Sequence, residues 1–429
     1  MDISDYIKKI HAKSLLSSIS SCDNEPKQNR AIDIIVPVFN GFEELQLCVA
    51  ALLKFTHKKH QITFYNDAST DERIKPFLDK LTDKHVSLHV VHQIENRGYL
   101  HNINFAMQQS KNDVVLLNAD TQVTENWLEE LAIIAADKNI GIVCPLSDNA
   151  TILSLNKSCL ENIAELHDFS GQWYALPTAV GSCMYIKRFI IEKFGVFDDY
   201  YHPGYGEECD YSLKIRQADF QIACAPAAFV FHHGSASFQD DANVLKQQHQ
   251  DLLDLRWYGY SAEVENFSEN NPIHFIEDYL TNCKQENNVL HVVHGLESLA
   301  GVELFTKKLL NDLPNTYNNH VLIYSVNPIP GLSRQSFRLN ENTKISKYQF
   351  FSYSHHTKIA NLIVNIKHNE LDIMFMRYLL FGQYKMVHFH SLVNNGSLIW
   401  PLICEYLAIP YVVSCHDHFV ACSNFSLLK

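Results

Sequence analysis

Several features that mark secreted or membrane-spanning proteins are missing from this sequence of 429 residues. Its 11 cysteines form no Cys-x-x-Cys pair and have no regular spacing, so we expect reduced, mostly buried cysteines and no disulfide framework. Residues 1–21 carry Asp2, Asp5 and several lysines where a secretory leader would have an apolar core. No stretch reaches the roughly 18 uninterrupted apolar residues that a membrane helix needs. We therefore expect a cytoplasmic protein, either soluble or peripheral on the inner face of the membrane.

Positive charge is also scarce. The chain has 35 Lys and Arg against 48 Asp and Glu, a net charge of −13, which argues against a nucleic-acid-binding surface. A protein of this balance that binds an anionic ligand must gather its few cations, or a metal ion, at one place. The hydrophobic fraction of 46% and the charged fraction of 19% are those of ordinary globular proteins.

The length leaves room for two or three domains. Ile3, Ile7 and Ile10 fall at helical spacing, but a polar, Ser-rich stretch follows them. Composition and pattern predict four segments: an N-terminal extension at 1–30, a first domain at 31–240, a helical tail and linker at 241–287, and a second domain at 288–429.

Strands and helices alternate from residue 31 onward. Apolar β-forming runs are predicted as strands at 32–38, 61–65, 87–92 and 114–117. Helical spacing of apolar residues predicts helices at 42–55, 73–81, 99–109 and 125–136. The alternation predicts an α/β fold with a parallel, right-handed, doubly wound sheet.

Polar residues follow each of these strands: Asn40, Asp67, Asn96-Arg97 and Asp120. Because the carboxyl ends of parallel strands meet at one edge of a sheet, we expect these side chains around a single crevice. This pattern is typical of a nucleotide site. It is no dinucleotide fingerprint, since no Gly-x-Gly-x-x-Gly follows the first strand.

Asp120 lies within the most informative stretch, residues 113–124, directly after its apolar run. A carboxylate at the end of a buried strand is a candidate ligand for a hard divalent cation, which takes oxygen donors and shares them with phosphates. The alternative is that Asp120 and Thr121 only begin a turn and cap the next helix.

Taken together, these motifs resemble the family-2 glycosyltransferases, which have the GT-A fold. The resemblance spans about residues 31–240 and rests on residues 35–40, 66–71, 96–98, 116–121, 181–186, 206–211 and 231–238, in the order of the family. It implies an inverting, metal-dependent transferase that uses a nucleotide sugar (a UDP-, GDP- or dTDP-sugar) and a glycan or lipid-linked acceptor, in bacterial surface-polysaccharide or glycoconjugate assembly.

The resemblance also implies roles at the donor. Pro37 and Phe39 would line the base, Asp67 would accept hydrogen bonds from base or ribose, and Arg97 would lie near the nucleotide. Asp120 would hold the Mg²⁺ or Mn²⁺ that bridges the diphosphate. Many relatives have a second aspartate where this chain has Asn118, whose amide oxygen binds a cation or nucleotide without adding charge.

At the acceptor, the resemblance implies that Glu208 is the general base and that Asp210 orients it or caps its helix. Otherwise Glu207, Glu208 and Asp210 simply decorate a helix N-terminus, where negative charge is favoured. His232 would be an extra metal ligand, although His233 is adjacent and a purely structural histidine is the alternative.

Residues 288–429 resemble the N-terminal, Rossmann-like half of family-4 (GT-B) glycosyltransferases, through residues 300–303, 416–419 and 421–428. That half mostly holds the acceptor. The second half of that fold would follow Lys429. The resemblance therefore implies either a fragment of a longer bifunctional protein or a remnant that serves as an acceptor platform.

Two other classes remain open. A nucleotidyltransferase would need a Gly-rich loop with a lysine near the first strand, and residues 38–44 have no lysine. A non-catalytic carbohydrate-binding or scaffold protein is favoured by Asn118 and opposed by Asp67, Asp120 and Glu208.

Overall fold

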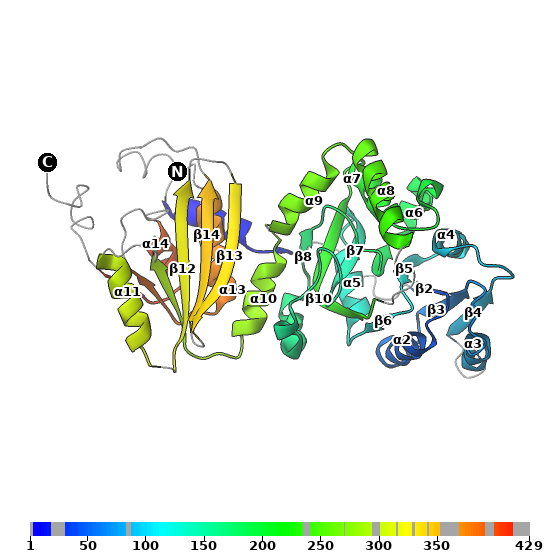
Figure 1. Ribbon diagram of the computed structural model, residues 1–429, viewed down its shortest axis with the longest axis horizontal. Helices are drawn as coiled ribbons and strands as arrows, with labels where there is room; N and C mark the ends of the chain where they lie inside the picture. Colours follow the sequence, from blue (N-terminus) through cyan, green and yellow to red (C-terminus); the bar gives the residue numbers. More distant parts are fainter. Residues whose placement is uncertain are drawn as a thin grey trace. The chain divides into compact units, whose positions relative to one another are not determined.

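The structure is a computed structural model that describes residues 3–18, 31–82, 87–234, 241–269, 271–293, 301–314, 316–327, 331–340, 343–351, 369–390 and 399–414. The chain forms two compact units (Figure 1). The large unit is Leu16–Ile273, and the small unit combines Met1–Leu15 with His274–Lys429. Among the described residues, no helix combines the length and the apolar character that crossing a bilayer requires.

The large unit is built on one sheet with the strand order β1-β8-β10-β7-β9-β5-β2-β3-β4, in which β1 is the short strand Ser17–Ser18. Four of its strands are parallel neighbours, as the alternating pattern predicts: β2 (Ile32–Val38), β3 (Gln61–Asn66), β4 (Leu88–His92) and β5 (Asp113–Leu117). The short strand β6 (Thr121–Val123) follows β5 and pairs with β10 (Gln221–His232).

The expectation of a wholly parallel sheet is wrong for the second half of this unit. Strand β9 (Cys183–Ile186) runs antiparallel to both β5 and β7 (Ile140–Ser147), and β8 (Gln172–Ala175) is antiparallel to β10. Between β7 and β9 the chain has only a 3₁₀ segment and β8, without the α-helical crossover that usually joins parallel strands. The sheet is therefore mixed.

Helices cover both faces of the large sheet. They are α2 (Phe42–Phe55), α3 (Ile74–Thr82), α4 (Tyr99–Gln109), α5 (Trp127–Ala135), α6 (Arg188–Phe194) and α7 (Glu207–Arg216). The apolar stripe of α2, including Leu45 and Val49, packs with α3 and α5 against Ile34 and Val36 of β2. Helices α4, α6 and α7 lie over the other face (Figure 1). This double cover explains why β2 and β5 read as continuous apolar runs.

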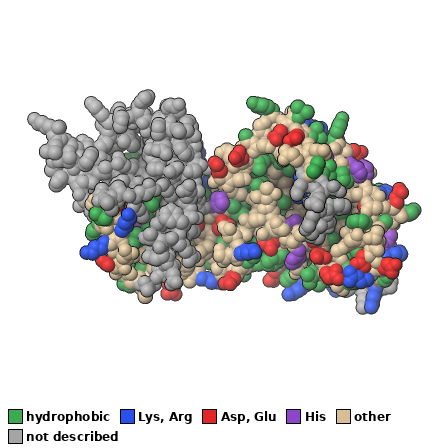
Figure 2. Space-filling model, viewed as in Figure 1, with side chains coloured by type: hydrophobic (Ala, Val, Ile, Leu, Met, Phe, Trp, Pro, Cys, Tyr) green, Lys and Arg blue, Asp and Glu red, His purple; other side chains and the backbone are tan. Residues whose placement is uncertain are grey.

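Two further helices, α8 (Asp241–Arg256) and α9 (Tyr260–Glu269), complete the large unit. The sequence analysis interprets residues 263–272 as a polar linker, and the structure shows that much of this stretch belongs to α9. On the face of the molecule shown in Figure 2, the basic side chains of the described residues are scattered among acidic ones.

The small unit has a second sheet, ordered β13-β14-β12-β11-β15-β16. The strands are β11 (Asn288–Val293), β12 (Asn318–Asn327), β13 (Gly331–Asn340), β14 (Thr343–Phe351), β15 (Met386–Phe389) and β16 (Tyr411–Val413). All neighbours are parallel except β13, which is antiparallel to β14. Helices α10 (Ile273–Asn282), α11 (Gly301–Asp312), α13 (Asn369–Gly382) and α14 (Trp400–Tyr406) accompany it. The family-4 resemblance remains a prediction, and residues 416–419 lie outside the described residues.

The N-terminal helix α1 (Ile3–Ser14) is part of the small unit and packs against α13. Its spacing was expected to be helical, and Ile7 and Ile10 are buried in the same apolar cluster as Phe375. The hydroxyl of Tyr6 donates to Asp372 at 2.7 Å, which anchors the helix near the start of α13.

Ile10→Ala should therefore destabilise the small unit by about 2–5 kcal/mol, because it removes a buried aliphatic side chain from a packed core. Ile10 is 0% exposed. Ile3→Ala on the same helix is the matched control, since Ile3 is 44% exposed. Urea unfolding followed by two probes, one per unit, measures the effect, and equal changes for both variants would contradict the packing of α1.

Candidate active site

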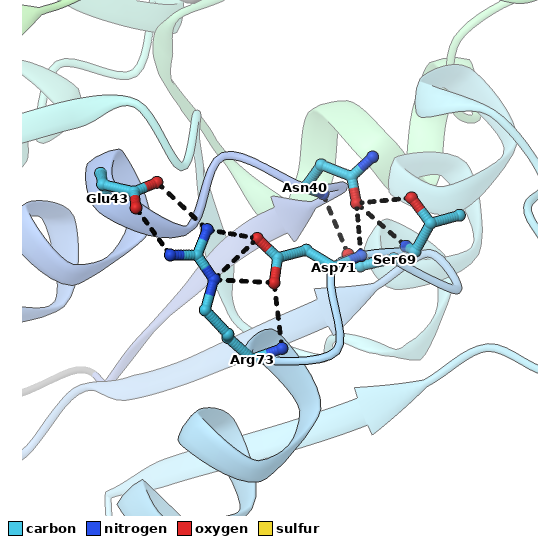
Figure 3. A network of polar contacts seen from close by, with 6 residues as sticks. Asn40, Glu43, Ser69, Asp71 and Arg73 are labelled. Carbon is cyan, nitrogen blue, oxygen red and sulfur yellow. Dashed lines mark hydrogen bonds and ion pairs between the residues drawn. The ribbon is translucent and has the colours of Figure 1, made fainter.

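The loops that follow β2 and β3 are joined by Asn40 (Figure 3). The side-chain oxygen of Asn40 accepts hydrogen bonds from the backbone N–H of Thr70 (2.9 Å) and of Asp71 (3.1 Å), and its own N–H donates to the Ser69 hydroxyl (3.0 Å). Asn40 has a left-handed backbone (φ 58°), which asparagine tolerates better than most residues. One side chain thus holds two loops of the rim together.

Arg73 extends this network along the surface (Figure 3). Its guanidinium lies 2.7 Å from Asp71 and 2.8 Å from Glu43, and it stacks 4.5 Å from the centre of the Phe42 ring. Hydrogen bonds from Arg73 lower the pKa of the Asp71 carboxyl group. The pairs are exposed, so each contributes little stability, but together they link the first turn of α2 to the loop after β3.

Asp67 forms the buried floor of the rim. Its carboxylate accepts the backbone N–H of Arg97 at 2.9 Å, and its own N–H donates to the Val38 carbonyl at 2.8 Å. Burial raises the pKa of Asp67, against the lowering effect of the backbone N–H groups of Arg97 and Gly98. Asp67 therefore ties β2, β3 and the loop before α4 into one frame.

The other predicted donor-binding residues surround this frame. Pro37 pairs with Tyr65 across β2 and β3, and Phe39 is 38% exposed just beyond the end of β2. The side chain of Arg97 is exposed, with its guanidinium 5.4 Å from the centre of the Phe105 ring. The backbone of Arg97 contacts Asp67, whereas its charge faces outward.

Asp120 lies between β5 and β6, beside the end of β10. The His232 Nε2 atom is 3.5 Å from a carboxylate oxygen of Asp120. The Nδ1 atom of His232 contacts the Asn149 carbonyl at 2.7 Å, so this nitrogen carries the proton and donates it. Nε2 is therefore directed toward Asp120. A partner that fixes the tautomer in this way is typical of a histidine that binds metal.

Burial lowers the pKa of His232, but the hydrogen bond to Asp120 and the contact with Asn149 outweigh it, so the pKa is raised. His233 is placed differently: its ring contacts Gln122, and only its backbone N–H reaches the Asp120 carbonyl, at 3.0 Å. Of the two adjacent histidines, His232 is the one whose ring faces Asp120.

Asn118 lies two residues before Asp120, just after the end of β5. Its side-chain oxygen is buried and accepts no hydrogen bond from any residue that the structure describes. Its backbone is held by Ser182 at 3.0 Å and by the Thr121 hydroxyl at 2.7 Å. A buried oxygen left without a donor is costly unless a ligand binds it. The donor set of Asn118, Asp120 and His232 therefore fits a divalent cation.

Two carboxylates begin α7. Gly206, with φ 95°, precedes Glu207 and Glu208 and lets the chain turn into the helix. Glu208 packs on Gly181, where an added Cβ would lie 3.6 Å from a carboxylate oxygen. Burial raises the pKa of Glu208, and burial followed by the charge of Glu208 raises the pKa of Glu207. A carboxyl group of raised pKa is a suitable proton acceptor near neutral pH.

Asp210, two residues after Glu208 in α7, has a structural environment. A single oxygen of its buried carboxylate accepts from the Trp257 indole (2.7 Å) and the Tyr201 hydroxyl (3.3 Å) and lies 3.1 Å from Arg256. Asp210 therefore fastens α7 to the end of α8. This arrangement suits the predicted orienting role and leaves proton transfer to Glu208.

Tyr99 was missed by sequence reasoning. Burial raises the pKa of its hydroxyl far above the ordinary value, and the charges of Glu207, Glu208 and Asp120 raise it further. The same side chain thus lies within electrostatic reach of the α7 carboxylates and of Asp120. The available signal was position, because Tyr99 directly follows Asn96-Arg97-Gly98.

A family model and a curated relative match parts of the chain. Residues 33–195 match the model of glycosyl transferase family 2, so the large unit carries a family-2 domain. A curated relative is the low-salt glycan biosynthesis hexosyltransferase Agl10 of Haloferax volcanii, 23% identical over 186 residues. The match covers 40% of this chain and 59% of that protein, so the chain spans less than two thirds of this relative.

The chain is also similar to solved structures. GalNAc-T7 with UDP, GalNAc and Mn²⁺ has a TM-score of 0.45 and 18% identity, covering 58% of this chain and 53% of that chain. The mannosyltransferase PcManGT from Pyrobaculum calidifontis, in complex with GDP-Man and Mn²⁺, has a TM-score of 0.45 and 17% identity, covering 65% and 80%. TarS of S. aureus with UDP-GlcNAc has a TM-score of 0.41 and 14% identity, covering 56% and 74%.

Asn40→Ala should destabilise the large unit by about 1–3 kcal/mol more than its control, because the N–H groups of Thr70 and Asp71 lose their acceptor. The matched control is Asn126→Ala, where the backbone is equally left-handed (φ 57°) and the side chain makes no cap hydrogen bond. Asn40→Asp keeps the acceptor and should restore most of the loss. Urea unfolding measures all three, and equal losses in the two alanine variants would refute the role of Asn40.

Proposed function

We propose that the large unit is an inverting glycosyltransferase that moves a sugar from a nucleotide-sugar donor to a hydroxyl of a glycan or lipid-linked acceptor. The observation that carries this proposal is that Glu208 packs on Gly181, while the adjacent Ser182 holds the backbone of Asn118, two residues before Asp120. This supports one site for the two carboxylates. The family-2 domain at residues 33–195 supports it.

In this proposal, Asp120, His232 and the Asn118 oxygen hold Mg²⁺ or Mn²⁺. The metal would neutralise the charge that develops on the departing nucleoside diphosphate. The orphaned oxygen of Asn118 and the direction of His232 Nε2 support this assignment. With an amide in place of a second carboxylate, the protein contributes less negative charge to the cation, so the bound diphosphate has a larger share in holding it.

The base and ribose of the donor would bind where the loops after β2, β3 and β4 meet. Pro37 and Phe39 would line the base, and Asp67 would accept its hydrogen bonds, while Arg97 would approach the nucleotide from the exposed side. The hydrogen bonds of Asn40 hold the loops after β2 and β3 together, so this part of the proposed donor site is pre-organised.

Glu208 acts as general base. It takes the proton of the acceptor hydroxyl while that oxygen forms a bond to the anomeric carbon and the bond from this carbon to the diphosphate oxygen breaks. Attack opposite to the leaving group inverts the configuration, so no enzyme nucleophile is needed. Asp210 acts through Glu208, since its contacts to Trp257 and Arg256 hold the first turn of α7 in place.

The wider role that we propose is bacterial surface-polysaccharide or glycoconjugate assembly, carried out in the cytoplasm or at the inner face of the membrane. The relative from Haloferax volcanii is a glycan biosynthesis hexosyltransferase, which supports this direction. For the small unit we propose the family-4-like acceptor half, either as a platform or as part of a longer transferase. The second candidate is a non-catalytic carbohydrate-binding protein, favoured by the uncharged Asn118.

A donor screen by thermal shift separates these two functions. With UDP-, GDP- and dTDP-sugars, we expect one nucleotide class to raise Tm only when Mn²⁺ or Mg²⁺ is present, because ligands that bind the native state stabilise it. Asp120→Ala should abolish the metal-dependent part. Stabilisation by glycans alone, with no donor effect in the folded wild type, would favour the binding protein.

Glu208→Gln should lower kcat by about 10²–10⁴-fold and leave donor binding in the thermal-shift assay intact. Because burial raises the pKa of Glu208, the wild-type rate should rise with pH through that raised value, since only the ionised carboxylate accepts a proton. The control is Glu129→Gln, an exposed acid in the first turn of α5. A pH–rate profile that is unchanged in Glu208→Gln would rule out this base.

A further inference from the structure

Three histidines of the small unit lie on one face of its sheet. His291 in β11 is the register partner of His388 in β15. His390 follows two residues later and thus points to the same face, because side chains alternate along a strand. The ring of Phe305, from α11, lies 6.3 Å from His390, so this face is the one that α11 covers. The cluster sits at the carboxyl end of β15, where parallel sheets place their ligands.

The spacing of the three rings suits one metal ion. One nitrogen from each of His291, His388 and His390 lies within 4.8 Å of the other two. The Nδ1 atom of His291 is 3.0 Å from the Nε2 atom of His390. A tetrahedral ion with metal–nitrogen distances of about 2.0–2.1 Å holds two imidazole nitrogens about 3.3 Å apart. Small ring rotations therefore suffice to bind an ion here.

Two neighbouring side chains orient the rings. The Asn319 side-chain oxygen lies 3.1 Å from His291 Nε2 and can only accept, so that nitrogen carries the proton and Nδ1 presents a lone pair toward His390. The Ser414 hydroxyl contacts His388 Nε2 at 2.7 Å, which makes Nδ1 of His388 the natural ligand atom. Partners that hold the second ring nitrogen are characteristic of metal-binding histidines.

Burial favours the uncharged form that a metal requires. His291 and His390 are 1% and 0% exposed. Burial lowers the pKa of His291 to about 4, with a further decrease from His388 and a partial opposing effect from Asn319. A hydrogen bond between His291 and His390 would explain that pair alone. It leaves unexplained why His388 stacks on His390, with ring centres 4.0 Å apart, in the same cluster.

We propose that His291, His388 and His390 form a binding site for a divalent transition metal of the zinc class. Three imidazoles suit Zn²⁺, Co²⁺, Ni²⁺ and Cu²⁺ and are poor ligands for Mg²⁺, which prefers oxygen. A three-histidine set leaves a fourth position for water or an anionic oxygen. The site belongs to the small unit, so it does not depend on the glycosyltransferase proposal for the large one.

Equilibrium dialysis of the full-length protein with ZnCl₂ tests the proposal. The protein is first stripped with chelator and then held in excess Mg²⁺, which competes for the oxygen-rich site of Asp120. We expect one tightly bound zinc per chain in the wild type and in Asp120→Ala. His291→Gln and His390→Gln should weaken zinc binding at least 100-fold, and Asn319→Ala about 10–100-fold.

His320→Gln is the matched control. His320 is also buried in this sheet, but it pairs with Leu290 and so faces the opposite side from His291. It should keep its zinc. No tightly bound zinc in the wild type, or equal zinc binding by the wild type and the His291 variant, would overturn the proposal.

A measurement on the wild type alone covers the case in which the histidine variants fail to fold. Stripped protein titrated with Co²⁺ in excess Mg²⁺ should develop the intense visible bands of a four-coordinate ion, and Zn²⁺ should displace them. Zinc should also raise the Tm of the small unit, because it binds only the native arrangement. Weak bands of a six-coordinate ion, with no change in Tm, would refute the site.

Discussion

The concentration of carboxylates at the carboxyl end of the large sheet is the constraint on which the rest of the site depends. Asp120, Glu207 and Glu208 all act on the Tyr99 hydroxyl, and burial together with these charges keeps that hydroxyl protonated. Burial raises the pKa of both Glu207 and Glu208, and the charge of Glu208 raises the pKa of Glu207 further, so a second negative charge here is unfavourable. In the proposed function, a divalent cation held by Asp120 would relieve part of this cost.

The carboxylates of such a site must be held in position by neighbouring side chains. Asp210 does this for α7. One oxygen of its carboxylate accepts hydrogen bonds from Trp257 and Tyr201 and pairs with Arg256, which fixes the N-terminal turn of the helix that carries Glu208. Asn40 does the same for the loops after β2 and β3. Asp210 and Asn40 are polar side chains whose hydrogen bonds go to the backbone or to neighbouring side chains. Such contacts are how a scaffold pre-organises the residues of a site.

Local pattern was enough to predict the elements that form the rim. The strand at 32–38 and the helices at 42–55 and 99–109 have the boundaries that their apolar spacing indicates. The antiparallel course of β9 could not be predicted in this way, because four apolar residues reveal a strand but not its direction. Tyr99 could not be predicted as a site residue because the carboxylates that act on it, Asp120 and the pair Glu207 and Glu208, are more than 20 and more than 100 residues away in the sequence. The packing of α1 on α13 likewise depends on a partner at the other end of the chain.

The two cation sites proposed for this chain differ in their chemistry. Asn118 and Asp120 present oxygen, with one imidazole from His232, which favours a hard ion that shares its ligands with phosphate. The cluster of His291, His388 and His390 presents nitrogen alone in a buried setting, which favours a borderline ion held by the protein itself. An ion at the first place would come and go with the donor, whereas one at the second would persist through turnover. The two can therefore be occupied at the same time by different metals without competing.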